Sequence, residues 1–239
     1  MAESSAAVQR RRRRRGFLIA VLAVVALSLT QAYVVKAYQV PSESMQPTLR
    51  HDGAFSDRFL VNRLAYLSED PRVGDVIVFA RPDTWGDEQE HGVLRRIAGA
   101  LGDVLGVGPS NVDPIVKRVI GTTGQTVRCC DEEGRLLVDE RPLEERYVEN
   151  DLPFVRSELD CAAGAPRCFP AVTVPAGMLL VAGDDRTRSD DSLTRCREAG
   201  ASGEDCARLV PLDDVVGEAF AVIFPFDRLG QELQARPLG

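Results

Sequence analysis

The strongest pattern in the chain is an uncharged, apolar run from Gly16 to Val35. At about 1.5 Å per residue this run forms a helix of about 30 Å, which matches the hydrocarbon core of a bilayer. We therefore expect a transmembrane helix at 16–35. A basic tail at 1–15 precedes this helix, and a domain at 36–239 follows it.

Six consecutive arginines, Arg10 to Arg15, give the predicted orientation. Basic residues beside a membrane span favour the cytoplasmic side, so the N-terminus is expected to be cytoplasmic and the domain extracytoplasmic. The alternative is a cleaved signal peptide, which has a shorter apolar core and a small-x-small cleavage site. The stretch Leu29–Ala32 is a poor match for such a site, so we favour a retained anchor in the plasma membrane, with the membrane lipid as a partner.

After this segment, short apolar runs separated by turn residues predict a mostly β fold. The core is expected to be β-barrel-like, at about 38–121 and 176–228, with a smaller inserted β subdomain at about 122–175. One amphipathic helix is expected at Gly92–Val107, where apolar residues recur at helical spacing. The expected strands are Phe59–Asn62, Val76–Phe79, Ile115–Ile120, Leu136–Asp139, Val172–Val174, Met178–Val181 and Ala219–Phe224.

The charge of the chain disfavours a nucleic-acid partner. The whole chain has 29 basic and 36 acidic residues, a net charge of −7. Residues 1–15 contain six arginines and Glu3, so the rest has 23 basic and 35 acidic residues, a net charge of −12. A strongly acidic domain repels a phosphate backbone.

Six cysteines fit an oxidising compartment. The spacing makes Cys161 with Cys168, and Cys196 with Cys206, plausible local disulfides. A bridge between the adjacent Cys129 and Cys130 would strain the geometry, so these two are expected to pair elsewhere or stay free. The chain has no C-x-x-C motif and only two histidines, so we expect no metal site and no cofactor.

One of only two lysines, Lys117, lies in the middle of the apolar run Ile115–Ile120. Alternation along a strand places Ile115, Lys117 and Val119 on one face. Apolar neighbours disfavour the charged form of the amine, so Lys117 is a candidate general base. The simpler interpretation is an edge-strand lysine whose amine reaches water.

Four short blocks combine serine, lysine, arginine and aspartate in a specific order. They are Pro-Ser-x-Ser-Met-x-Pro-Thr-Leu at 41–49, Asp-Arg-Phe-Leu-Val-Asn-Arg at 57–63, Val-Lys-Arg-Val-Ile-Gly at 116–121, and Gly-Asp-Asp-Arg with Ser-Asp-Asp-Ser at 183–192. In this order they closely resemble the bacterial type I signal peptidases, from about residue 40 to 226. The abundance of Ala, Arg, Gly and Pro is typical of a GC-rich, actinobacterium-like source.

The resemblance implies a membrane-anchored serine endopeptidase that removes signal peptides from secreted precursors. Ser44 matches the nucleophile and Lys117 the general base of a Ser-Lys dyad. Ser42 matches an oxyanion-hole residue, and Ser189 matches the serine that orients the lysine amine. The resemblance implies supporting roles for Met45, Asp184, Arg186, Asp191 and Arg118, and Arg118 is expected to pair with one of these carboxylates.

The last block departs from the family pattern, which continues Gly-Asp-Asn-Arg-Asp-Asn-Ser-x-Asp-Ser-Arg. Four of its positions are occupied differently, by Asp185, Thr187, Arg188 and Leu193. Leu193 removes the arginine that usually pairs with Asp191. Arg186, Arg188 or Arg195 is the expected substitute.

The alternative function is a catalytically degenerate envelope protein of the same fold that binds exported chains without cutting them. The altered last block favours it, whereas the intact Ser44, Lys117 and Ser189 favour an enzyme. Other serine hydrolases fit less well, because the chain has neither G-x-S-x-G nor a Ser-x-x-Lys that begins at Ser44.

Overall fold

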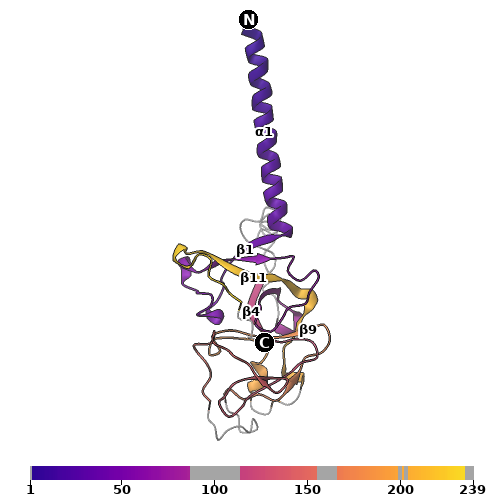
Figure 1. Ribbon diagram of the computed structural model, residues 1–239, viewed down its shortest axis with the longest axis vertical. Helices are drawn as coiled ribbons and strands as arrows, with labels where there is room; N and C mark the ends of the chain where they lie inside the picture. Colours follow the sequence, from indigo (N-terminus) through magenta and orange to yellow (C-terminus); the bar gives the residue numbers. More distant parts are fainter. Residues whose placement is uncertain (1, 87–113, 155–165, 199–200, 202–203, 235–239) are drawn as a thin grey trace. The chain divides into compact units, whose positions relative to one another are not determined.

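The computed structural model describes residues 2–86, 114–154, 166–198, 201 and 204–234 (Figure 1). These residues fall into two compact units that divide between Lys36 and Ala37. The expected helix at Gly92–Val107 lies outside the described residues.

The first unit contains the helix α1, Ala2–Tyr33 (Figure 1). Its segment Gln9–Tyr33 is long and apolar enough to cross a membrane, as the sequence predicts. Large apolar side chains such as Phe17 and Leu22 are exposed. The helix ends at Tyr33 rather than Val35, because the β-branched Val35 begins a strand.

The second unit is mostly β, in agreement with the sequence prediction, and its larger sheet has seven strands in the order β1-β2-β11-β3-β4-β9-β10. The pairs from β2 to β10 are antiparallel. The order ends at β1 and β10, so the described strands show no closed barrel, and the expected barrel-like arrangement of the core stays a prediction. The strands are β1 Val35–Gln39, β2 Arg58–Asn62, β3 Val76–Ala80, β4 Pro114–Gly121, β9 Met178–Ala182, β10 Val210–Pro211 and β11 Val215–Phe224.

A smaller sheet has four antiparallel strands in the order β7-β6-β5-β8. All four strands fall between residues 126 and 173, within the range expected for the inserted subdomain. Their bounds are β5 Thr126–Arg128, β6 Leu137–Val138, β7 Arg141–Pro142 and β8 Val172–Thr173. The expected strands Leu136–Asp139 and Val172–Val174 correspond to β6 and β8. Strands β5 and β7, and β10 of the larger sheet, were not among the expected strands, because runs of two or three residues rarely show a clear alternation.

Strand β3 lies between two apolar clusters. Val76 and Val78 pack in one apolar cluster, and Ile77 and Phe79 pack in another, so both faces of β3 are buried. Lys117 on β4 pairs in register with Ile77. Lys117 therefore lies on the same face as Ile77 and Phe79, with Ile115 and Val119 as its neighbours, as the sequence predicts.

The disulfide pairing of the cysteines agrees with the prediction for one pair and differs from it for another. Cys196 and Cys206 form the predicted disulfide. Cys129 and Cys130 are bonded to each other, so the prediction that they pair elsewhere or stay free was wrong. The peptide bond that joins these two residues is cis. Cys161 lies outside the described residues.

Candidate active site

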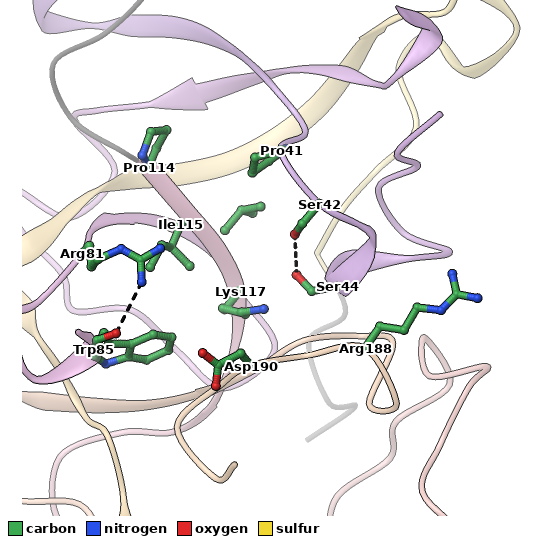
Figure 2. Close-up of a pocket in the computed structure, with 11 residues that line it drawn as sticks. Pro41, Ser42, Ser44, Arg81, Trp85, Pro114, Ile115, Lys117, Arg188 and Asp190 are labelled. Carbon is green, nitrogen blue, oxygen red and sulfur yellow. Dashed lines mark hydrogen bonds between the residues drawn. The ribbon is translucent and has the colours of Figure 1, made fainter. Parts of the chain in front are cut away.

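The candidate site is a cavity of about 770 Å³ in the second unit (Figure 2). Its lining combines hydroxyls, one amine, two guanidinium groups, one carboxylate and an apolar wall. The lining residues are Pro41, Ser42, Ser44, Arg81, Trp85, Pro114, Ile115, Val116, Lys117, Arg188 and Asp190.

A short helical turn at Glu43–Met45 presents Ser44 to the cavity. Ser42 precedes the turn in an extended conformation, and its hydroxyl lies 3.1 Å from the hydroxyl of Ser44. Met45 is fully buried in the apolar cluster that contains Val76 and Val78, so its side chain anchors the turn to the sheet. The N–H groups at the start of such a turn have no partner within it, and that of Ser44 is one of them.

Lys117 enters the same cavity from the middle of β4 and is only 4% exposed. Its amine donates a hydrogen bond to the hydroxyl of Ser189 at 3.1 Å. In Figure 2 this amine points toward the side of the cavity that carries Ser42 and Ser44. Burial lowers the pKa of Lys117 from 10.5 to about 8, although the carboxylates of Asp191, Asp190 and Asp184 raise it.

The segment after β9 joins the serine turn to the lysine. The N–H of Gly183 donates to the hydroxyl of Ser189 at 3.0 Å, and the N–H of Asp185 donates to the carbonyl of Ser44 at 3.0 Å. A Cβ atom on Gly183 would lie 2.4 Å from that carbonyl and 2.5 Å from the Ser189 hydroxyl oxygen. Only glycine at position 183 therefore allows this segment to approach the backbone of the serine turn so closely.

Arg118, the residue after Lys117, forms the ion pair expected from the sequence, and its partner is Asp184. The pair is bidentate at 2.9 and 2.6 Å, and both side chains are buried. The Asp184 carboxylate also accepts a hydrogen bond from Thr48 at 2.5 Å, and the Arg118 guanidinium lies 4.0 Å from the ring centroid of Tyr147. Charge-assisted bonds of this kind are strong when water is excluded.

Arg186 and Arg188 have partners other than Asp191. Arg186 pairs with Glu145 and donates to the carbonyl of Gly183 at 2.8 Å. Arg188 pairs with Glu43, in the serine turn, at 2.6 Å. Both arginines therefore link the 183–192 segment to other parts of the site.

Among the described residues, the cation within ion-pair distance of Asp191 is Arg197, at 3.5 Å. The expected substitutes Arg186, Arg188 and Arg195 were therefore the wrong choice. Leu193, where the family pattern has arginine, is fully buried in an apolar cluster. Its N–H donates to the Asp191 carboxylate at 3.0 Å, so only its backbone contacts this acid.

Several residues of the site carry no signal in the sequence. Asp190 and Trp85 line the cavity, and Glu145 and Tyr147 hold the two buried arginines. These residues come from segments that are far apart in the chain and gain their roles by folding. In the described part of the chain, no group of three or more His, Cys, Asp or Glu residues could hold a metal ion.

The chain is a member of a peptidase family. Residues 13–224 match the family described as "Signal peptidase, peptidase S26", and the chain belongs to that family. It is 35% identical over 226 residues to the "Probable signal peptidase I" of Mycobacterium leprae, a match that covers 88% of this chain and 77% of the relative. It is also 35% identical over 225 residues to the "Signal peptidase I" of Mycobacterium tuberculosis, covering 92% and 75%.

Mycobacterial relatives fit the GC-rich, actinobacterium-like source that the composition indicates. Among solved structures, a crystal structure of a signal peptidase I from Enterococcus faecalis V583 matches with 25% identity and a TM-score of 0.33. That match covers 63% of this chain and 97% of the other.

Replacing Gly183 with alanine is expected to lower peptidase activity about 100-fold, because the new methyl group would push the Ser44 carbonyl and Ser189 apart. Cleavage of a precursor protein by detergent-solubilised variants measures this effect. Gly16→Ala is the matched control, since a Cβ atom there meets nothing within 4 Å. Full activity in Gly183→Ala would contradict the close approach described above.

Proposed function

We propose that this chain is a membrane-anchored serine endopeptidase that cleaves signal peptides from exported precursors. Ser44 is the nucleophile and Lys117 the general base. The observation that carries the proposal is the buried Lys117 amine, which is hydrogen-bonded to Ser189 and shares a cavity with the Ser44 hydroxyl. Membership of the signal peptidase family supports the substrate class.

In the first step Lys117 removes the proton from the Ser44 hydroxyl as the oxygen attacks the scissile carbonyl carbon. The carbonyl oxygen becomes negatively charged in the tetrahedral intermediate. The Ser42 hydroxyl and the Ser44 N–H donate hydrogen bonds to this oxyanion. Ser42 already lies beside Ser44, at 3.1 Å between hydroxyl oxygens, so a small rotation brings its proton to the substrate.

In the second step the protonated Lys117 gives its proton to the leaving amine of the mature protein, and the C–N bond breaks. The signal peptide is left as an ester of Ser44. Neutral Lys117 then takes a proton from a water molecule, which attacks the ester and releases the peptide as a carboxylic acid that loses its proton to the solvent. The proton on Lys117 returns to the Ser44 oxygen, which restores the enzyme.

Ser189 gives the lysine a fixed direction through this cycle. Its hydroxyl accepts from the Lys117 amine at 3.1 Å and from the Gly183 N–H at 3.0 Å. A lysine has four rotatable side-chain bonds, and fixing its amine reduces the entropy lost in the transition state. Ser189 therefore acts as an orienting residue.

The apolar wall of the cavity supports a preference for small residues such as alanine at positions −1 and −3 of the substrate. Pro41, Ile115 and Val116 form part of this wall. A rigid apolar wall excludes large side chains by steric clash and polar ones by the cost of desolvation.

The helix α1 supports membrane anchoring, since Gln9–Tyr33 is long enough to span a bilayer and its large apolar side chains are exposed. The arginines at 10–15 favour a cytoplasmic N-terminus, which leaves the catalytic domain outside, in the plasma membrane. The exported domain would meet signal peptides as they leave the membrane.

Replacing either dyad residue is expected to abolish cleavage. Ser44→Ala removes the nucleophile, and Lys117→Ala or Lys117→Arg removes a base that can be neutral near pH 8. The rate should fall by about 10³-fold or more in each variant. Incubation of detergent-solubilised protein with a precursor, followed by gel electrophoresis, measures the product.

Lys36→Arg is the matched control, because Lys36 is the other lysine of the chain and has no part in the proposed mechanism. It should keep wild-type activity. If the wild type binds the precursor but leaves it uncut, the degenerate binding protein is the correct interpretation.

Activity is expected to rise with pH and to reach half its maximum near pH 8. The neutral amine is the base, and burial lowers the pKa of Lys117 to about 8. At pH 6 roughly one hundredth of the lysine is neutral, so cleavage there should be about 100-fold slower than the plateau. Measuring kcat/KM from pH 5.5 to 9.5 tests this, with circular dichroism at each pH as a control for folding. A profile that is flat across pH 7 to 9 would refute the lowered pKa.

Protease added outside intact cells is expected to cut the domain that follows Val40 and to spare an epitope tag at the N-terminus. The positive tail at 10–15 is the reason, because it keeps the N-terminus in the cytoplasm. Immunoblots for tags at each end of the protein measure the fragments. Protection of the C-terminal tag, with loss of the N-terminal one, would reverse the proposed orientation.

A further inference from the structure

Arg208 contacts three consecutive residues that follow the orienting serine, Ser189. Its guanidinium pairs with the Asp190 carboxylate, with one bond of 3.2 Å, and donates to the Asp191 carbonyl at 2.9 Å. The backbone N–H of Arg208 donates to the carbonyl of Ser192 at 3.0 Å. A single arginine thus fixes the side chain and backbone of the segment that carries Ser189.

Arg208 is itself held firmly. Its side chain is only 8% exposed, and its guanidinium lies 4.9 Å from the ring centroid of Trp85, which lines the cavity. The disulfide between Cys196 and Cys206 ends two residues before it. Arg197, which pairs with Asp191, directly follows the other cysteine of this disulfide. Arg197 and Arg208 therefore each lie within two residues of this disulfide.

These contacts matter for Lys117 in two ways. Ser189 accepts the hydrogen bond of the lysine amine, so movement of the 190–192 backbone would move this acceptor. The charges also matter, because the positive Arg208 lowers the pKa of Lys117 and the negative Asp190 raises it. The charged groups that face the amine are Asp184, Asp190, Asp191 and Arg208, and Arg81 and Arg188 line the same cavity.

We propose that Arg208 is a positioning residue for Lys117, because Arg208 neutralises the Asp190 carboxylate and fixes Ser189. The Cys196–Cys206 disulfide holds Arg208 in place. In this chain Arg208 and Arg197 together replace the arginine that the family pattern has at position 193. The side chain of Leu193 packs in an apolar cluster and has no charge with which to neutralise a carboxylate. The inference rests on the proposed function of Lys117 as the base.

The test measures the pKa of Lys117 without a substrate. The full chain in detergent is labelled with acetic anhydride from pH 6 to 11, and the acetylated fraction of each lysine is read by mass spectrometry. Only Lys36 and Lys117 occur in the chain, so each signal is assigned by sequence and Lys36 is the internal reference. Cleavage of a precursor is measured in parallel over the same pH range.

Arg208→Gln is expected to raise the pKa of Lys117 by about 0.5 to 1 pH unit, because Asp190 is then no longer neutralised. The acid limb of kcat/KM should move up equally, with a loss of about three- to tenfold at pH 7. Adding Asp190→Asn should restore the pKa. Arg128→Gln is the matched control, since Arg128 pairs with Glu140 in the smaller sheet, and it should leave the pKa unchanged.

The double variant Cys196→Ser/Cys206→Ser should raise the pKa in the same direction, whereas Cys129→Ser/Cys130→Ser should not. An unchanged pKa of Lys117 in Arg208→Gln overturns the proposal, even if the variant is less thermostable. An unchanged pKa in Cys196→Ser/Cys206→Ser removes the role given to the disulfide. Failure of the wild type to cleave any precursor would instead refute the proposed function, because the labelling result does not depend on cleavage.

Discussion

The buried ion pair between Arg118 and Asp184 is the constraint on which the site depends. Arg118 fixes β4 and therefore its neighbour Lys117, and Asp184 fixes the segment that leads to Ser189. Thr48, which donates to Asp184, ties the segment after the serine turn to the same pair. Removing one partner from such a pair costs about 3 to 5 kcal/mol, because an uncompensated charge stays buried. Three parts of the chain that are distant in sequence are thereby held in one geometry.

The site also depends on the burial of Lys117. Burial lowers the pKa of the amine, whereas the carboxylates around it raise this pKa. Asp184, Asp190 and Asp191 all raise the pKa of the amine, yet desolvation outweighs them and the pKa falls to about 8. Each of these carboxylates has an arginine partner, Arg118, Arg208 or Arg197, which limits its effect. The site thus keeps the acids that brace its backbone and still leaves roughly a tenth of the lysine neutral at pH 7.

The two functional units of the chain depend on different physics. The helix α1 depends only on local composition, since an apolar run of sufficient length meets the thickness of a bilayer wherever it occurs. The site depends on long-range pairing, because β4 lies between β3 and β9 and the serine turn must pack on this sheet through Met45. The chain therefore joins an element set by local composition to a site that only a complete fold can create.

The sequence by itself determined the apolar helix and most of the longer strands, and it supplied candidate residues for the site. Alternation placed Lys117 with Ile115 and Val119, and four short motifs predicted Ser42, Ser44 and Ser189. The sequence could not determine which charges meet, because ion pairs depend on distances between segments that pattern and spacing do not give. Arg197 and Arg208 lie outside the motifs, and only the tertiary structure brings them to Asp191 and Asp190. It also decided that Cys129 bonds to Cys130, since the spacing of cysteines along a chain does not give their disulfide connectivity.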